Sequence, residues 1–190
     1  MKNTIKLLTE VLLAVILFVS CQKDEVEKNE TKNYFKVGDT EYNLSDGLLE
    51  NSGVDGNNNW YDGYLTRLTL ISDGLSWQMM DGDYKNLLGQ GDIIDFLMFS
   101  TTGNTLDNKD YLFSSAEPHS VGTFGDGAYV INYVFDPMNF DEADRFKSGT
   151  VSVSRKDNEY NITIDGLSTN GKTITGFYKG KLRYADRTSY

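Results

Sequence analysis

The sequence predicts an all-β fold, a single antiparallel β-sandwich or barrel that ends in a three-stranded meander. Apolar and polar residues alternate with a period of two in several segments, as strands with one buried face require. Gly, Asn and Asp separate these segments at short intervals, as turns do. Aromatic residues become dense from Tyr34 onward, where these strands and turns begin.

The clearest alternation lies in the last third of the chain. Residues 150–155 alternate valine with polar side chains, and residues 160–165 alternate tyrosine or isoleucine with polar ones. Between them, the polar residues 156–158 have the length of a hairpin turn. A second turn is expected at 166–171, followed by one long last strand over 174–184. These three strands form the predicted meander.

Earlier strands are expected at 34–37, 40–44, 64–72, 75–80, 93–100 and 129–135. Gly38-Asp39 predicts a tight turn between the first two. Residues 65–71 and 93–99 carry apolar side chains on both faces, which predicts central rather than edge strands. Residues 139–146 are the one helical candidate.

The first 20 residues predict a bacterial lipoprotein signal peptide. Lys2 and Lys6 are followed by an apolar run over 7–19, which is shorter than the ~20 residues that a transmembrane helix needs. Ser20 then precedes Cys21, the only cysteine. We expect cleavage before Cys21 and attachment of palmitate and other acyl chains there, which anchors the protein in outer-membrane lipid. An ordinary secretory signal with a chance cysteine is the alternative.

Residues 21–33 are expected to be the lipidated cysteine and a disordered charged tether, and residues 34–190 a single all-β domain. The tether begins Gln22-Lys23-Asp24-Glu25. Lys23, Asp24 and Glu25 resemble the export signal of surface-exposed lipoproteins in the Bacteroidota, which implies display on the cell surface. A tether that faces the periplasm is the alternative. Residues 149–182 likewise resemble the closing strands of uncharacterised β domains in such lipoproteins, which implies a fold and no functional residues.

The charge and the residue types of the chain argue against nucleic-acid binding, catalysis and metal binding. A net charge of −10 at pH 7 opposes binding to nucleic-acid phosphates, so no nucleic-acid partner is expected. His119 is the only histidine, no Gly-x-Ser-x-Gly sequence is present, and lipidation would consume the thiol of Cys21. We therefore expect no enzyme, no catalytic residue, no cofactor and no metal site. Residues 55–62 resemble the start of a calcium loop, but Trp60 replaces its turn glycine and no acid stands at the twelfth position. A flexible turn rich in Asn and Gly is therefore the preferred interpretation, and calcium binding is the alternative.

Aromatic side chains are the candidates for ligand binding. Trp60 and Tyr61 stand in the Asn-rich loop 54–62, and Trp77 lies in an expected strand. Such rings can stack on the apolar face of a sugar, although Trp77 can equally belong to the core. We expect a non-enzymatic binding or structural accessory role, with a glycan or protein partner. The alternatives are a carbohydrate-binding module of a glycan uptake system, a lipocalin-like small-ligand carrier, and a hydrolase with two carboxylates in one cleft.

Overall fold

The computed structural model describes residues 32–56, 59–81, 83–134 and 143–188. The expected signal peptide, Cys21 and the sequence Lys23-Asp24-Glu25 lie outside these residues. The described residues belong to one compact unit, Thr31–Tyr190. They form twelve strands: β1 (Tyr34–Val37), β2 (Thr40–Asn43), β3 (Asp46–Val54), β4 (Tyr64–Ile71), β5 (Leu75–Met80), β6 (Asp83–Ser100), β7 (Lys109–Phe113), β8 (Thr123–Val134), β9 (Asp144–Lys156), β10 (Glu159–Ser168), β11 (Thr173–Gly180) and β12 (Arg183–Asp186).

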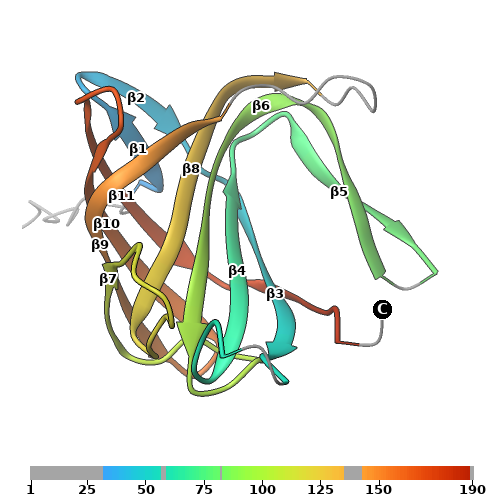
Figure 1. Ribbon diagram of the computed structural model, residues 1–190. Coiled ribbons are helices and arrows are strands. Elements are labelled where there is room, and N and C mark those ends of the chain that lie inside the picture. The colour runs from blue at the N-terminus through green and yellow to red at the C-terminus, as the bar shows by residue number, and fades with distance from the viewer. Residues whose placement is uncertain (1–31, 57–58, 82, 135–142, 189–190) are drawn as a thin grey trace, which may run out of the picture. The chain divides into compact units, whose positions relative to one another are not determined.

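The strands form one sheet that curls into a half-barrel, so the all-β expectation is confirmed (Figure 1). Its order is β12-β3-β4-β6-β8-β7-β9-β10-β11-β1-β2, and β5 pairs with β6 beside this path. Most neighbours are antiparallel, but β12 runs parallel to β3 and β7 parallel to β8, which makes the sheet mixed. As expected from their apolar faces, β4 and β6 are central strands.

Local sequence explains the hairpins. Gly38 lies between β1 and β2 with φ 60°, a conformation that glycine adopts without steric cost. Asp157 turns the chain between β9 and β10 with φ 58°, which Asp and Asn tolerate better than most residues. β10 pairs antiparallel with β9 on one side and with β11 on the other.

Three local expectations are wrong. The last strand is not continuous to residue 184, because β11 ends at Gly180 and β12 moves to the opposite end of the strand order. The Tyr178 hydroxyl donates to the Lys181 carbonyl (2.9 Å) at this break, and Arg183 pairs with Asp46 (2.6 Å) beyond it. Residues 144–146 begin β9 rather than end a helix, and the described residues contain no helix; residues 139–142 of that candidate lie outside them. The turn expected at 166–171 begins later, because β10 continues to Ser168.

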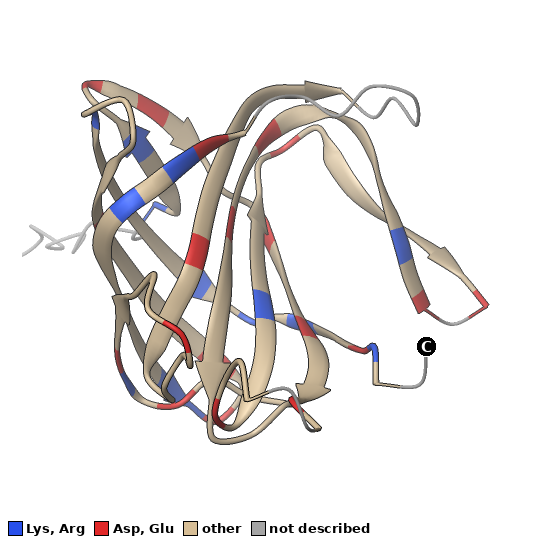
Figure 2. Cartoon of the chain, viewed as in Figure 1, with Lys and Arg blue, Asp and Glu red and all other residues tan. Residues whose placement is uncertain are grey.

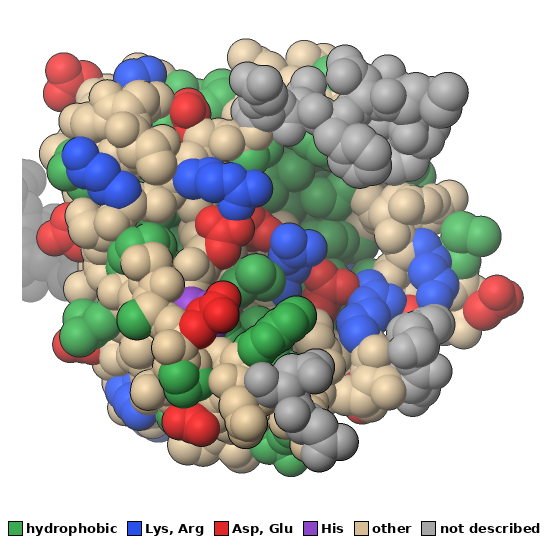
Figure 3. All heavy atoms as spheres, viewed as in Figure 1, with side chains coloured by type: hydrophobic (Ala, Val, Ile, Leu, Met, Phe, Trp, Pro, Cys, Tyr) green, Lys and Arg blue, Asp and Glu red, His purple; other side chains and the backbone are tan. Residues whose placement is uncertain are grey.

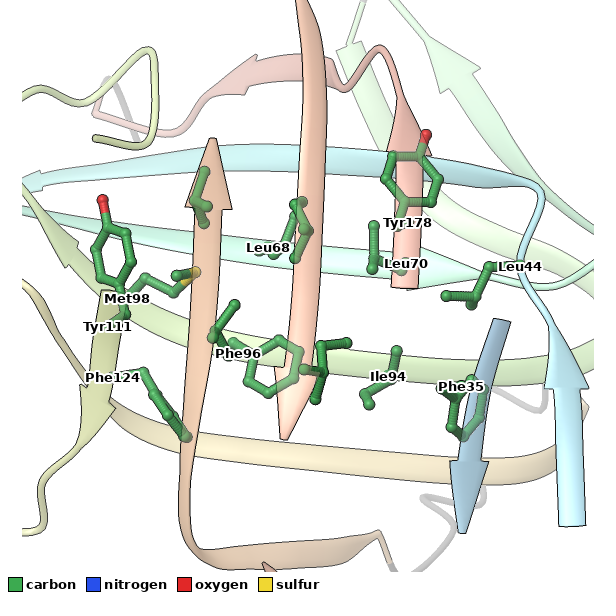
Figure 4. Packing of buried hydrophobic residues seen from close by; sticks show 14 of the residues in the cluster. Phe35, Leu44, Leu68, Leu70, Ile94, Phe96, Met98, Tyr111, Phe124 and Tyr178 are labelled. Carbon is green, nitrogen blue, oxygen red and sulfur yellow. The ribbon is translucent and has the colours of Figure 1, made fainter. Parts of the chain in front are cut away.

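Large side chains fill the inside of the half-barrel. Figure 4 shows residues from distant parts of the chain, among them Phe35, Phe96, Phe124 and Tyr178, pointing into one apolar cluster. Phe96 packs edge-on against Phe124, with ring centroids 5.5 Å apart. The buried Tyr111 hydroxyl hydrogen-bonds to Ser100 (3.0 Å) and accepts a bond from the Asp107 amide (2.7 Å), so its polar end is satisfied.

A single long hairpin bends back over the outer face of this sheet. β4 and β5 pair with successive halves of β6, so 64–80 and 83–100 form one hairpin (Figure 1). It bends where 72–74 face 89–92; we call this segment the bend. Beyond it, β5 and residues 83–88 form what we call the arm. Leu48 and Ile71 lie outside the main core cluster yet are 0% exposed. These two residues give the outer face a small apolar layer of its own.

The bend depends on glycines because two backbones meet there. Gly74 and Gly89 have φ of 90° and 104°, and a Cβ on Gly89 would collide with the carbonyl oxygen of Gly74. A Cβ on Gly91 would lie 2.5 Å from Ser72 Oγ. That hydroxyl accepts a hydrogen bond from the Asp92 amide (2.7 Å), and the Ser72 amide donates to the Asp92 carbonyl (2.9 Å).

We therefore predict that Gly89→Ala destabilises the fold far more than Gly171→Ala. Gly171 also has a positive φ (83°), but open space surrounds its Cα, so alanine there should cost only about 1 kcal/mol of backbone strain. Gly89→Ala adds a backbone collision and should cost about 3 kcal/mol. Urea denaturation of both variants measures the difference. Equal losses would show that the close approach at the bend is not a constraint.

Candidate functional site

A groove of about 480 Å³ lies between the arm and the outer face of the sheet. This volume falls within the ~300–1,000 Å³ usual for small-molecule sites. Figure 3 shows a hollow on this side of the molecule, with hydrophobic side chains inside it and charged ones near its edge. The lining residues combine aromatic, aliphatic and charged side chains from five strands and the C-terminal segment: Leu48, Glu50, Arg67, Thr69, Trp77, Tyr84, Lys85, Asn86, Leu87, Ile93, Asp95, Val130, Tyr133 and Arg187.

The floor of the groove consists of residues on the outer face of the sheet, where the alternation of side chains along each strand places them. Leu68 and Leu70 of β4 enter the main core, so Arg67 and Thr69 must face the other way. On β6, Ile94 and Phe96 likewise point inward and leave Asp95 on the outer face. The register pairs Glu50 with Arg67 and Thr69 with Asp95, so the polar residues of three strands meet on one surface.

The arm contributes the aromatic wall. Trp77 of β5 and Tyr84 of β6 pack edge-to-face, with ring centroids 6.3 Å apart and planes at 75°. Trp77 Nε1 is shielded from solvent, and none of the described groups accepts a hydrogen bond from it. Buried donors of this kind normally have a partner, so this N–H is available to an acceptor that arrives with a ligand.

Arg187 holds the arm to the sheet. Its Nη2 and Nε donate to Glu50 Oε1 of β3 (2.6 and 2.8 Å), while Nη1 donates to Asp83 Oδ2 of the arm (2.6 Å). Nη2 also donates to the carbonyl of Tyr84. The side chain is 23% exposed, so this fork joins two elements in a partly desolvated setting where ion pairs are stronger than at the surface.

Asp95 is the perturbed carboxyl of the floor. Burial raises its pKa above the ordinary 3.8, and the nearby Arg67 guanidinium, whose Nε lies 3.0 Å from Asp95 Oδ2, opposes this shift. Charges on Asp126 and Glu50 raise the pKa further, and that on Arg145 lowers it. A carboxyl with a raised pKa in a groove is a recurrent mark of functional sites, although structural ion pairs produce it too.

The predicted aromatic residues separate into two places. Trp77 lines the groove, whereas Trp60 and Tyr61 are not among the described residues that line it. Trp60 is 61% exposed on its loop. Tyr61 is half-buried and packs against Phe99 with tilted rings, whose centroids lie 5.3 Å apart; its hydroxyl donates to the Gly53 carbonyl (3.4 Å). The three rings therefore do not form one platform.

The loop that carries Trp60 is anchored at its second half. The Asp55 carboxylate accepts hydrogen bonds from the amides of Trp60 and Tyr61. The His119 amide donates to the Trp60 carbonyl and the Asp62 amide donates to the His119 carbonyl, both at 2.8 Å. The His119 ring stacks on Phe99, with centroids 4.5 Å apart and planes at 10°. These contacts give His119 a structural role in fixing the loop.

Sequence reasoning missed most of the groove. Glu50, Arg67, Asp95 and Arg187 carry no local motif, and only the fold-back of the arm brings them together with Trp77. Glu50 and Asp95 are two carboxylates in one cleft, but each is paired with an arginine. Within the described ranges, no group of three or more His, Cys, Asp or Glu side chains is arranged to hold a metal ion. The same ranges contain no helix long and apolar enough to cross a membrane.

Comparison with known proteins gives no relative from which a function could be transferred. No protein-family model matches the chain, and no curated protein or solved structure is significantly similar to it.

We predict that Asp95 makes the folded state less stable as the pH rises from the ordinary carboxyl range towards neutrality. Because its folded-state pKa is raised, the folded protein holds a proton that the unfolded chain has already released, which favours folding at the acidic end of this interval. The free energy of unfolding of the wild type minus that of Asp95→Asn should therefore fall with increasing pH. Urea titrations at a series of pH values measure it. A difference that grows with pH would mean that the Arg67 pair outweighs burial.

Proposed function

We propose that this protein is a surface-anchored outer-membrane lipoprotein with a non-enzymatic binding role, and that the groove beneath the arm is its ligand site. The ligand is a neutral molecule with polar edges and an apolar face, such as a carbohydrate. The observation that carries this proposal is the composition of the groove, which joins aromatic rings to charged side chains that already neutralise one another.

The charges of the groove favour a neutral ligand. Arg67 pairs with Asp95, while Arg187 pairs with Glu50 and with Asp83. Lys85 also pairs with Asp83, at 2.9 Å. A charged ligand would have to compete with these existing partners and lose its own hydration. Hydroxyl groups can instead donate to carboxylate oxygens and accept from guanidinium N–H groups without displacing a whole ion pair.

The aromatic wall favours a ligand with an apolar face. Trp77 and Tyr84 present large rings at low conformational cost, and the Trp77 N–H lacks a protein acceptor among the described residues. A pyranose offers both C–H groups for stacking and oxygens for this donor. This chemistry supports the carbohydrate-binding role over the lipocalin-like carrier, because side chains such as Phe35, Phe96 and Tyr178 occupy the interior that such a carrier would need.

Anchoring through Cys21 would place this site close to a membrane without any apolar protein segment. One acyl chain gives only marginal membrane binding, and additional chains make the anchor stable, at roughly 0.8 kcal/mol per buried methylene. The stretch between Cys21 and Tyr34 spans at most about 45 Å when extended. A domain on such a tether can meet soluble glycans or those of the cell surface.

We predict that a carbohydrate identified on a glycan array binds to the groove and depends on Trp77. Trp77→Leu should weaken binding at least about tenfold, because it removes a central aromatic anchor. Trp60→Leu makes the same change on an exposed loop outside the groove and should leave the affinity unchanged. Isothermal titration calorimetry of both variants measures this. Affinity should vary less than about twofold between roughly 0.05 and 0.5 M NaCl, as expected for a neutral ligand.

Loss of binding in Trp60→Leu but not in Trp77→Leu would assign the ligand site to the 54–62 loop and contradict binding in the groove. Steep salt dependence would contradict a neutral ligand. Turnover of the bound glycan would contradict the non-enzymatic role.

We also predict that Cys21→Ala releases the protein from the membrane fraction and abolishes labelling by a palmitate analogue. Replacing Lys23, Asp24 and Glu25 with alanine should leave the acyl label in place but protect the protein from protease added to intact cells. Membrane fractionation and protease shaving measure the two effects. Protection of the wild-type protein in intact cells would contradict surface display.

A further inference from the structure

We propose that the free edge of β5 is a docking site for an extended segment of a partner protein, one with an uncharged β-strand-forming centre and basic residues at both ends. The partner segment would add to the arm as a further antiparallel or parallel strand. This inference does not depend on the ligand of the groove, because it uses the backbone edge of the arm and not its inward-facing side chains.

Unlike the strands at the two ends of the strand order, β5 carries no protection against pairing. Among the described residues, β2 and β12 end the strand order and β5 pairs only with β6. β2 and β12 are four residues long and include the charged residues Glu41, Arg183 and Asp186. β5 is longer, with the sequence Leu-Ser-Trp-Gln-Met-Met, and it contains neither charge nor proline. Short length, charge and proline are the usual means by which edge strands avoid new partners.

The backbone of β5 is suitable for pairing. Gly74 O accepts a hydrogen bond from the Gln90 amide (3.2 Å), which directs this residue towards β6. Alternation along the strand then directs the backbone groups of Ser76 and Gln78 to β6 and those of Trp77 outward. The irregularity in this pair places the extra residue, Lys85, on β6, so β5 itself continues without a bulge.

The surroundings of this edge select the chemistry of the partner. Asp73 precedes β5 and Asp81 follows it, and both are exposed (Figure 2 shows acidic positions at the bend and at the tip of the arm). They lie in the turns at the two ends of β5, whose six residues span about 20 Å. Met79 and Met80, each 49% exposed, add apolar surface near one end. A strand with basic ends and an uncharged centre complements this pattern in either direction.

A second copy of this chain fits the same edge poorly. Antiparallel pairing of β5 with its own copy would place Asp73 of one molecule beside Asp81 of the other at both ends. Two like-charge contacts oppose this arrangement, and the chain as a whole carries a net charge of −10. The charge pattern therefore favours a different, basic segment over self-association.

The test uses two synthetic peptides, Lys-Thr-Val-Thr-Val-Thr-Val-Thr-Lys and the same sequence with Glu at both ends. The Lys-ended peptide should bind, and it should slow hydrogen exchange of the Trp77 amide, which an adventitious surface contact would not do. The double variant Asp73→Asn, Asp81→Asn should weaken this binding about three- to tenfold at low salt. Asp81 has φ 55°, which asparagine tolerates, so the variant should keep the turn.

The matched control is Asp39→Asn, Asp157→Asn, which removes the same two charges from exposed turns elsewhere, Asp157 having φ 58°. It should leave peptide affinity unchanged. Equal weakening in both double variants, or binding without protection of Trp77, would overturn the proposal. Failure of the Lys-ended peptide to bind, or equal binding of the Glu-ended peptide, would overturn it as well. Protection of Trp77 that depends on protein concentration alone would assign the edge to a second copy instead.

Discussion

The close approach of two backbones at the bend is the constraint on which the candidate site depends. Gly74 and Gly89 allow the carbonyl of one strand to lie where a side chain would otherwise stand. Without that approach the long hairpin would continue straight, and the outer face of β3 and β4 would be exposed to water. Leu48 and Ile71 would then be exposed apolar residues rather than fully buried ones. Glycine at the bend thus determines both a second apolar layer and a groove.

Because side chains alternate between the two faces of a strand, β3, β4 and β6 contribute both to the core and to the groove. Their inward residues, such as Leu68 and Phe96, hold the half-barrel together, and their outward residues form the floor of the groove. The floor is positioned by the buried core, whereas the arm is joined to β3 through the charged hydrogen bonds of the Arg187 fork. This division resembles the general arrangement of binding sites, in which a stable scaffold carries a less stable recognition element.

The sequence was sufficient for the fold class, for short strands such as 34–37 and 75–80, and for the central position of β4 and β6, whose apolar residues face both ways. It was insufficient for β3, where Leu48 and Leu49 are buried on opposite faces and the alternation disappears. It could not reveal the groove either. Glu50 and Arg67 are neighbours across β3 and β4, but Arg187 reaches Glu50 only because the chain crosses to β3 after Gly180, and Trp77 joins them only because the arm folds back. Trp77 was the one groove residue that composition alone indicated.

The fluorescence of Trp77 tests most directly whether the arm closes the groove over this ring. The chain has two tryptophans, so Trp60→Phe leaves Trp77 as the only indole emitter. In that background, Arg187→Gln removes the ion pairs that join the arm to β3. Acrylamide should quench Trp77 more strongly in this variant, while the far-ultraviolet circular dichroism of the half-barrel stays unchanged. Equal acrylamide quenching of Trp77 with and without Arg187 would show that the Arg187 fork does not hold the arm over the groove.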